Sequence, residues 1–360
     1  MADEVLLETP LAGLHRELGG RMVPFAGYSM PVQYPAGIMA EHLHCRAHAA
    51  LFDVSHMGQA ELVGEGAAAA LERLTPAEVQ ALKPGRQRYG LLLNERGGIV
   101  DDFMVANLGD RLFLVANASR KHVDFPLIES VLPAGVRLRP LPERALLALQ
   151  GPAVASIIPT EMGFMGISAM EIAGIPVITS RSGYTGEDGL EISVAADKAE
   201  ALARHLLSLP GVMPAGLGAR DSLRLEAGLC LYGNDLDENT NPVEAALVWS
   251  MGKRRRMAWD FAGAEPVREA LDNGPKRLRV GIRPEGRQPA RAHTAIESGG
   301  ATVGEVTSGG FGPSVGAPVA MGYVRRDLAA DGTPLELRVR DKALPARVAP
   351  TPFQPHRYAR

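Results

Sequence analysis

Alternating apolar and polar positions predict a mixture of short strands and helices along the first 260 residues of the chain. Residues 87–94 and 112–117 are rich in Leu, Val and Tyr or Phe and are bounded by turn-forming residues, which predicts strands. Residues 197–209 repeat leucine at spacings of four and three, which predicts an amphipathic helix. We therefore expect this larger part of the chain to hold two α/β units.

The pattern changes after about residue 275. Short apolar runs are separated there by Gly, Pro and Asp, and these runs cover residues 277–282, 301–307, 319–324 and 335–339. Runs of this length and spacing are typical of a small all-β domain. Asp331-Gly332 is predicted to form a hairpin turn within it. We place the boundary between the two parts near residues 260–275.

Composition narrows the class of protein. A chain with 46% hydrophobic and 22% charged residues can bury a large core, which excludes general disorder. The net charge of −3 does not favour binding to nucleic acid or to an anionic membrane. Two cysteines cannot form a disulfide framework, the acidic start has no signal peptide, and the best apolar stretch, residues 145–159, is too short to cross a bilayer. We expect a soluble cytoplasmic protein.

Two adjacent carboxylates interrupt the apolar segment Ile99–Val105, which is unusual for the interior of a strand. In an extended chain, Asp102 would share a face with Val100 and Met104, whereas Asp101 would point to the opposite face. The two acids are therefore not expected to act as a carboxylate pair. A buried carboxylate needs a donor, so we expect a ligand amine or a backbone N–H beside it. The alternative, that these aspartates only direct a hairpin turn, stays open here.

A glycine-rich turn, Gly183–Gly189, leads into an amphipathic strand on which Glu191 faces away from the apolar row. A carboxylate there could accept two parallel N–H bonds from the edge of a pterin or a guanine. The alternative is a glutamate that faces solvent. The segment Gly216–Gly228 could present helix N–H groups to an anion, although its glycine spacing is a weak nucleotide signal. Arg220 near that helix start opposes the helix dipole, which indicates either a positional role or a structural ion pair.

Other clusters carry less chemistry. His42, His44, His48 and His56 lie close together with a cysteine, but no metal-ligand spacing supports them, so we expect no metal. Neither Cys45 nor Cys230 has a recognisable base nearby, which argues against thiol catalysis. The run Lys253–Arg256 is typical of a solvated face, and it could alternatively dock an acidic protein.

Many short segments together resemble the aminomethyltransferase (T-protein) family of the glycine cleavage system, essentially from end to end. In chain order, the segments are Thr9–Leu11, Arg21–Tyr28, Pro31–Tyr34, Asp53–Met57, Gln150–Pro152, the turn at Gly183, Gly216–Gly228, Leu231–Asp235, Thr307–Gly309, Met321–Val324 and Pro352–Phe353. None is decisive alone, and their collinear occurrence is what makes the resemblance specific.

The resemblance implies an α+β fold in which two intertwined α/β (ferredoxin-like) units and a C-terminal all-β, barrel-like domain surround a central folate cavity. It implies a folate-binding region over residues 1–265 that consists of two α/β units. One unit, of roughly residues 55–145, is inserted into the sequence of the other, and the barrel covers residues 275–360. It further implies tetrahydrofolate as co-substrate and a lipoyl carrier (H-protein) as partner. The reaction would move a methylene group from the aminomethyl-lipoyl arm to folate and release ammonia.

Carried over by position, the resemblance implies that Asp102 is the catalytic carboxylate beside N5 and N10 of the folate. Glu191, Arg220 and Tyr358 match folate contacts. Further expected pocket-lining residues are Met57, Tyr89, Asn117 and Tyr184. These roles agree with the physical chemistry, because a carboxylate can stabilise developing positive charge and another can bind the pterin edge.

Two related classes of protein share this fold. Demethylating domains of the sarcosine or dimethylglycine oxidase type are joined to a flavin domain, and this chain has no strand–Gly-x-Gly-x-x-Gly–helix fingerprint and no length for one. Non-catalytic folate-binding proteins of the iron–sulfur maintenance group carry a Lys-Gly-Cys motif that is absent here. Both absences favour the aminomethyltransferase.

Overall fold

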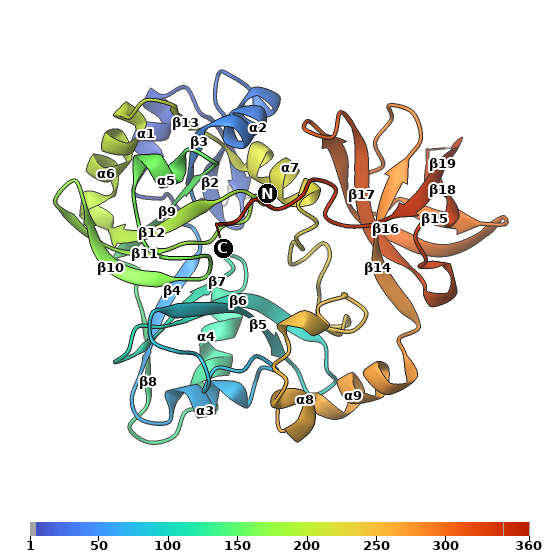
Figure 1. Ribbon diagram of the computed structural model, residues 1–360, viewed down its shortest axis with the longest axis horizontal. Coiled ribbons are helices and arrows are strands. Elements are labelled where there is room, and N and C mark those ends of the chain that lie inside the picture. Colours follow the sequence, from blue (N-terminus) through green and yellow to red (C-terminus); the bar gives the residue numbers. More distant parts are fainter. Residues whose placement is uncertain (1–4, 341, 360) are drawn as a thin grey trace.

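The computed structural model describes residues 5–340 and 342–359. A six-stranded sheet, a five-stranded sheet and a closed barrel lie around a common centre, at the upper left, lower left and right of Figure 1. The mixed helix–strand N-terminal part and the C-terminal barrel expected from the sequence are therefore confirmed.

The six-stranded sheet has the strand order β10-β11-β12-β9-β3-β13. Its strands are β3 (Ala49–Asp53), β9 (Arg144–Gln150), β10 (Ile167–Ile172), β11 (Ile175–Ser180), β12 (Gly189–Ala195) and β13 (Val212–Pro214). Only the pairing of β13 with β3 is parallel within this sheet. A separate hairpin of β1 (Arg21–Phe25) and β2 (Tyr28–Gln33) precedes it.

The five-stranded sheet has the order β5-β6-β7-β4-β8 and is inserted between β3 and β9, which pair with each other. Its strands are β4 (Gly58–Val63), β5 (Arg86–Leu93), β6 (Ile99–Asn107), β7 (Leu112–Ala116) and β8 (Arg137–Pro140). The predicted strands at residues 87–94 and 112–117 correspond to β5 and β7. Because the chain leaves and re-enters the first sheet between two paired strands, the two units are intertwined.

Helices cover both sheets. The apolar rows of α1 (Ala12–Glu17), α5 (Val154–Ile157) and α6 (Ala196–Ser208) bury one face of the six-stranded sheet, and α2 (Ile38–Ala47) and α7 (Leu217–Glu226) bury the other. Of the three leucines that predicted this helix, Leu202 and Leu206 of α6 are fully buried there, and Leu209, directly after α6, is partly buried. On the five-stranded sheet, α3 (Ala67–Glu72) and α4 (Lys121–Glu129) cover one face. The segment with η1 (Val248–Ser250), α8 (Arg255–Ala258) and α9 (Ala264–Asn273) covers part of the other.

The barrel closes in the order β14-β17-β16-β15-β18-β19. Its strands are β14 (Arg277–Pro284), β15 (Ala295–Ser298), β16 (Ala301–Gly312), β17 (Ala317–Arg325), β18 (Pro334–Val339) and β19 (Lys342–Ala349), with η2 (Arg326–Leu328) after β17. The prediction of a hairpin at Asp331-Gly332 is wrong. These residues form a turn, but β17 pairs with β14 and β16, while β18 pairs with β15 and β19.

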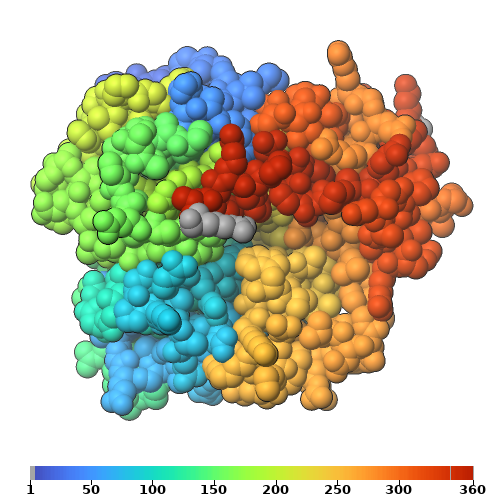
Figure 2. All heavy atoms as spheres, viewed as in Figure 1, coloured from blue at the N-terminus to red at the C-terminus, as the bar shows by residue number. Residues whose placement is uncertain are grey.

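After the barrel, the C-terminal segment crosses back toward the two sheets and ends at the centre of the molecule (Figure 1). In Figure 2 this segment lies as a red band across the junction between the barrel and the six-stranded unit. Arg357 anchors it, because its guanidinium donates to Glu187 Oε1 at 2.6 Å and to the Arg46 carbonyl at 2.8 Å. No helix in the described ranges combines the length and apolar character needed to cross a membrane.

Candidate active site

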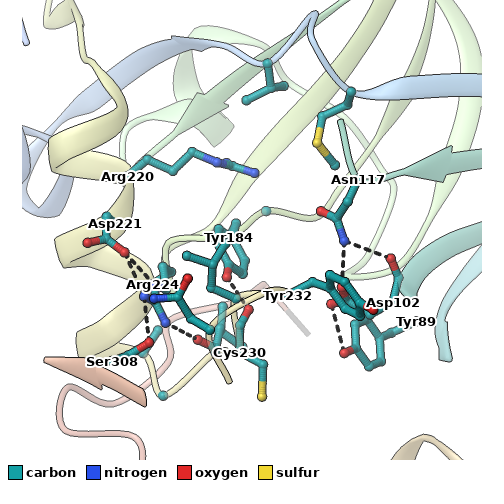
Figure 3. A pocket seen from close by; sticks show the side chains of 18 of the residues that line it. Tyr89, Asp102, Asn117, Tyr184, Arg220, Asp221, Arg224, Cys230, Tyr232 and Ser308 are labelled. Atoms are coloured by element: carbon teal, nitrogen blue, oxygen red, sulfur yellow. Dashed lines mark hydrogen bonds and ion pairs between the residues drawn. The ribbon is translucent and has the colours of Figure 1, made fainter. Parts of the chain in front are cut away.

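A cavity of about 1140 Å³ lies where the two sheets, α7, the barrel and the C-terminal segment meet. Figure 3 shows Asp102, Asn117 and Tyr89 on one side of it and Arg220, Arg224 and Ser308 on the other. The eight residues predicted to act on or line a ligand all border this cavity: Met57, Tyr89, Asp102, Asn117, Tyr184, Glu191, Arg220 and Tyr358. The chain therefore brings these residues together from positions far apart in the sequence.

Strand β6 presents Asp102 to the cavity, and two neighbours hold its carboxylate. Tyr89 of the adjacent strand β5 donates its hydroxyl to Asp102 Oδ2 at 2.9 Å, and Asn117 Nδ2 donates to Oδ1 at 2.7 Å. Burial and the nearby charge of Asp101 raise the pKa of Asp102 to about 7, against the opposing effect of these two donors. A carboxyl group with this pKa can exchange a proton near neutral pH.

The expected alternation along this strand is only partly right. Asp102 and Met104 line the cavity as predicted, but Val100 packs with Phe103 on the face that α3 and α4 cover. Leu92 and Leu93 of β5 pair with Asp101 and Ile99 of β6, so Val100 has no partner and forms a β-bulge. The bulge reverses the expected alternation of side chains before Asp101.

The two aspartates are also more closely linked than expected. Asp101 is fully buried, and Asn117 donates its Nδ2 to Asp101 Oδ1 at 2.9 Å as well as to Asp102. Burial, together with the carboxyl of Asp124, raises the pKa of Asp101. The simple picture of two independent acids on opposite faces missed this shared amide, because Asn117 follows a different strand, β7.

Glu191 of β12 also borders the cavity, and the protein uses only part of the hydrogen-bonding capacity of its carboxylate. Ser182 Oγ donates to Glu191 Oε2 at 3.0 Å, and residues 5–340 and 342–359 supply no donor to Oε1. Its neighbours Leu190 and Ile192 are buried in the sheet core, so the predicted alternation of this strand is correct. One oxygen of Glu191 is therefore free to accept a hydrogen bond from a ligand.

Arg220, the fourth residue of α7, extends across the cavity with its guanidinium 4.8 Å from the centre of the Tyr184 ring. Its Nη1 is buried and has no hydrogen-bond partner among the described residues. The structural ion pair considered from the sequence is not formed with Asp221, because that carboxylate binds Arg224 at 2.8 Å. Burial lowers the pKa of Arg220, partly against the charge of Glu191, and leaves a cation with unused donors.

The turn before Glu191 is fixed by Gln150. Its Nε2 donates to the Ser182 carbonyl at 2.9 Å, and its Oε1 accepts from Thr185 Oγ1 at 2.9 Å. A Cβ at Gly183 would lie 1.7 Å from Gln150 Oε1, so this close approach requires glycine. The same turn places Tyr184, whose hydroxyl donates to the Cys230 carbonyl.

At the N-cap of α7, a carboxylate of the chain takes the N–H of Gly216. Glu41 of α2 accepts from Gly216 N at 2.9 Å and from Tyr34 N at 2.5 Å. A Cβ at Gly216 would lie 2.5 Å from the backbone of Val32. Gly216 therefore allows close packing of the start of α7 against β2.

Aromatic rings complete the walls. Tyr358 of the C-terminal segment stacks on Phe164 with 4.1 Å between ring centres and an interplanar angle of 11°. Trp249 stacks on Tyr89 at 5.4 Å, and 67% of its surface is exposed. The Met57 side chain packs against the core that α2 and α7 cover. These side chains border the cavity with apolar surface.

Comparison with known proteins agrees with this arrangement. Residues 11–255 match the family described as GCVT N-terminal domain, and residues 277–354 match the Glycine cleavage T-protein C-terminal barrel domain. The chain belongs to the glycine cleavage T-protein family.

Similar members of this family match over nearly the whole chain. The mitochondrial aminomethyltransferase of Gallus gallus is 48% identical and is matched over 99% of this chain and 95% of its own. The one of Homo sapiens is 44% identical over 99% of this chain and 92% of its own. The crystal structure of the glycine cleavage system aminomethyltransferase T from Bartonella henselae superposes with a TM-score of 0.94, at 44% identity, and covers 99% and 100% of the two chains.

Some residues of the T-protein cavity were not found from the sequence. The sequence analysis did not select Trp249 as a cavity residue. The one feature of the sequence that could have drawn attention to it is that the chain has only two tryptophans. A buried network was also missed, in which Arg224 donates to Asp235 Oδ2 at 2.9 Å and Ser308 Oγ donates to the same oxygen at 2.8 Å. This network joins α7 to the barrel strand β16, so only the fold brings its members together.

The histidine and cysteine clusters have structural roles. His42 contacts Glu226 Oε2 at 3.1 Å, His44 contacts the Gly211 carbonyl at 2.9 Å, and no group of three or more potential ligands for a metal occurs within the described ranges. His56 borders the cavity, and burial lowers its pKa to about 4, so it is neutral at pH 7. Burial raises the thiol pKa of both Cys45 and Cys230, which keeps them unreactive.

The cation run is only partly a solvated face. Arg255 is buried and contacts the Glu72 carbonyl and Asp260, and Arg254 pairs with Glu72. Lys253 and Arg256 alone are exposed. The interpretation of the whole run as a free basic patch is therefore wrong, because two of its cations hold α8 against α3.

Proposed function

We propose that this protein is the aminomethyltransferase of a glycine cleavage system. In this reaction the methylene group of an aminomethyl-lipoyl carrier protein moves to tetrahydrofolate, which gives 5,10-methylenetetrahydrofolate, ammonia and the dihydrolipoyl carrier. The end-to-end similarity to aminomethyltransferases supports this proposal over a demethylation domain or a non-catalytic folate-binding protein. The observation that carries it is that Asp102, Glu191 and Arg220 border one cavity.

The polar groups left unused by the protein fit a reduced folate. Glu191 Oε1 can accept from the ring N–H or the exocyclic amine of a pterin, and a charged acceptor strengthens such bonds. The unpartnered Arg220 Nη1 can donate to an acceptor on the same ligand. Without a ligand this buried donor is unsatisfied, which is costly, so ligand binding would relieve the cost.

Folate, when bound, supplies the amine nitrogens that take up the methylene carbon. The role we assign to Asp102 is to hold a carboxylate where positive charge develops and to accept a proton at one of its oxygens. Tyr89 and Asn117 fix the plane of that carboxylate with hydrogen bonds of 2.9 and 2.7 Å. Because the pKa of Asp102 is about 7, the ionised form that this role requires is well populated at and above neutral pH.

The surrounding apolar side chains contribute by excluding water. Tyr358 with Phe164 and Trp249 with Tyr89 form stacked pairs at the cavity wall. In such a site, fixed charges act with less dielectric screening than in water, so a single carboxylate can contribute several kcal/mol to the transition state. The same walls would protect the reactive methylene group from hydrolysis.

We place the protein in the cytoplasm on the basis of its two free cysteines, and this location stays a prediction. The named relatives from Gallus gallus and Homo sapiens are mitochondrial proteins. Separating cytosolic and organellar fractions of the source cells and detecting the protein by immunoblot would test it.

The direct test of function is reconstitution. The purified protein is mixed with tetrahydrofolate and a lipoyl carrier loaded with the aminomethyl group, and ammonia and methylenetetrahydrofolate are quantified. We expect both products in equal amounts, and neither when the carrier is unloaded. Folate binding without turnover would favour a non-catalytic folate-binding protein. Product formation from free sarcosine or dimethylglycine with an added flavin enzyme, but not from the carrier, would favour a demethylation domain.

A further inference from the structure

His56 is a buried histidine at the crossing point between the two sheets. It lies in the turn Val54–Met57, which connects β3 of the six-stranded sheet to β4 of the five-stranded sheet. Only 3% of its surface is exposed, and it borders the cavity. Since Glu191 belongs to the first sheet and Asp102 to the second, His56 lies at the junction of the two sheets that carry these acids.

Strand pairing places this turn close to the catalytic candidate. Gly58, two residues after His56, pairs with Ala116 of β7. The residue after Ala116 is Asn117, which donates to Asp102 Oδ1 at 2.7 Å. The turn with His56 and the residue that holds Asp102 therefore lie side by side at one end of the adjacent strands β4 and β7.

The ring of His56 has no hydrogen-bond partner within residues 5–340 and 342–359. Its Nδ1 is buried and unpartnered, and no described group bonds to Nε2 either, since only the carbonyl of His56 takes part in a bond with a side chain. The nearest carboxylate in the sequence, Asp53, already accepts from Thr9 Oγ1 at 2.6 Å, contacts His15 Nε2 at 2.8 Å and accepts from Ser55 N at 2.8 Å. A buried polar ring without a partner is costly, so a ligand in the cavity is the expected partner.

Other contacts hold this ring in place without using its nitrogens. Phe25 meets it edge to face, with 5.5 Å between ring centres and an interplanar angle of 84°, and the Tyr28 ring lies 6.3 Å away. Lys121 Nζ donates to the His56 carbonyl at 3.0 Å and to the Tyr28 hydroxyl at 2.7 Å. The imidazole is therefore oriented before any ligand binds.

His56 is neutral at pH 7 and carries a single N–H. Burial lowers its pKa to about 4 against the charge of Asp53, and the charges of Arg220 and Lys121 act in the same direction as burial. A neutral imidazole has its hydrogen on one of the two nitrogens. A hydrogen on the enclosed Nδ1 would lack an acceptor, whereas one on Nε2 can be donated to a ligand. The less costly tautomer therefore has its hydrogen on Nε2.

The edge of a reduced pterin has its polar groups in a matching order. The exocyclic amine and the ring N3–H are followed by the 4-oxo group and then by N5. If Glu191 accepts from the amine and from N3–H, and Asp102 acts beside N5, the oxo group lies between these two residues. That group is an acceptor and needs a donor, and His56 lies at the junction between the sheets of Glu191 and Asp102.

We propose that Nε2–H of His56 donates to the 4-oxo group of the bound reduced pterin and that His56 thereby determines specificity for an oxo group at this position. The inference rests on the folate-dependent function proposed above. The contact fixes the pterin in the orientation that turns N5 toward Asp102. A 4-amino pterin offers an N–H donor at the same place and is disfavoured, because two donors then face each other. The oxo group has two lone pairs, so Arg220 can donate to it as well.

Binding of two ligands tests this contact. The dissociation constants of tetrahydrofolate and of its 4-amino analogue are measured anaerobically by titration calorimetry for the wild type, His56→Leu and the control His205→Leu, since His205 is exposed on α6. In His56→Leu we expect the Kd for tetrahydrofolate to rise about 3- to 10-fold, because a hydrogen bond to a neutral acceptor is lost. We expect the Kd for the analogue to stay within about twofold. The preferences of all other cavity residues cancel in the ratio of the two constants.

The other outcomes each have a separate meaning. Equal weakening of both ligands in His56→Leu would overturn the inference, because His56 would then only shape the wall. Unchanged binding of both would also overturn it, because water would then be the partner of the ring. Failure of the wild-type protein to bind tetrahydrofolate would contradict the proposed function itself, so the two failures are distinguishable.

NMR spectroscopy of the wild-type protein gives a second test that does not depend on a folded His56 variant. With ¹⁵N-labelled histidine, we expect one neutral imidazole whose Nε2–H proton moves downfield with tetrahydrofolate and not with the 4-amino analogue. His356 also borders the cavity, but its Nε2 contacts the Ala227 carbonyl at 2.8 Å, and its signal is identified by its loss in His356→Gln. Absence of the expected response among the signals of the nine histidines would overturn the inference.

Discussion

At the scale of single residues, the surroundings of Asp102 have opposing effects on its pKa. Tyr89 and Asn117 favour its charged form, whereas burial and Asp101 disfavour that form more strongly and raise the pKa from 3.8 to about 7. A group whose pKa is raised on folding binds protons in the native state that the unfolded chain releases. The contribution of Asp102 to stability is therefore lost as the pH rises from about 4 to 7.

This linkage predicts a pH-dependent gain in stability for Asp102→Asn. The amide cannot ionise, so we expect the melting temperature of the variant to exceed that of the wild type more at pH 8 than at pH 5. Differential scanning calorimetry at both pH values measures this difference. Asp110→Asn is the control, because Asp110 is exposed and pairs with Arg111 at 2.7 Å. A gap that is the same at both pH values would contradict the assigned pKa.

Glu191→Ala should weaken folate binding. Hydrogen bonds to charged groups are worth about 1.5–3 kcal/mol, which corresponds to roughly a 10- to 100-fold increase in Kd for tetrahydrofolate. Titration calorimetry of the folded variant measures this change. Glu171→Ala is the control, because Glu171 lies exposed on β10 of the same sheet. An unchanged Kd would refute the role of Glu191 in holding the pterin.

The sequence could predict these residues only in part. The period of a strand was enough to place Glu191 opposite its apolar row and to separate Asp102 from Asp101, because alternation is a local property, whereas the assignment of Glu191 and Asp102 to a pocket came from the family resemblance. It could not find the Asn117 amide between two acids, nor the bulge at residue 100, because both depend on neighbouring strands. It could not identify Trp249 as part of the cavity wall, because that position depends on the stacking of Trp249 on Tyr89.

At the scale of elements, one carboxylate joins two helices to the barrel. Glu226, the last residue of α7, binds Arg46 of α2 at 3.0 Å and His42 of α2 at 3.1 Å, and its other oxygen accepts from Ser314 N at 2.8 Å. Ser314 lies in the loop between β16 and β17. Burial raises the pKa of Glu226, but His42 and Arg46 outweigh that effect and lower it to about 2.

Glu226→Gln should therefore destabilise the protein in a pH-dependent way. Since the pKa is lowered on folding, the stabilising contribution is complete above the unfolded value of 4.5 and is lost as the pH falls toward 2. We expect a loss of about 2–3 kcal/mol at pH 7, because the substitution removes one of the two buried carboxylates that accept from Arg46, the other being Glu187. Urea unfolding at pH 7 and pH 4 should show a smaller gap at the lower pH. The exposed Glu269→Gln is the control, and an equal loss in both variants would contradict this role.

Element types followed from the pattern, whereas their partners did not. The leucine spacing of α6 and the alternation of β5 and β7 are local, and the prediction of these elements was correct. The hairpin expected at Asp331-Gly332 failed because the barrel closes by pairing β14 with both β17 and β19, which separates β17 from β18. Barrel closure depends on the whole set of strands, so the sequence of a single turn cannot show which strands pair.

At the scale of the whole molecule, the short apolar runs separated by Gly, Pro and Asp after residue 275 were sufficient to predict a separate all-β part. The central cavity was not readable from pattern, because its walls come from both sheets, α7, the barrel and the C-terminal segment. The end-to-end resemblance to a family supplied that knowledge. That Tyr358 and Ser308 border the same cavity as residues of β5 and β6 depends on how the two sheets, the barrel and the C-terminal segment assemble.

The exposed cations of the α8 segment offer a surface for an acidic carrier protein. Arg254 and Arg255 are engaged in ion pairs, so only Lys253 and Arg256 are free to attract a partner. We expect the double variant Lys253→Gln/Arg256→Gln to raise the KM for the carrier a few-fold at low salt and to flatten its salt dependence. The exposed Arg268 of α9 provides a control substitution, Arg268→Gln. If the KM for the carrier depends on salt in the double variant as it does in the wild type, Lys253 and Arg256 do not attract the carrier.

The central claim is that the carboxylate of Asp102 acts on the methylene transfer inside the shared cavity. The most direct measurement is a single turnover of Asp102→Asn with loaded carrier and saturating tetrahydrofolate, with the Kd for folate measured on the same sample. We predict a rate lower by about 10²–10⁴-fold and a Kd within about threefold of the wild type. A rate close to that of the wild type would contradict the account.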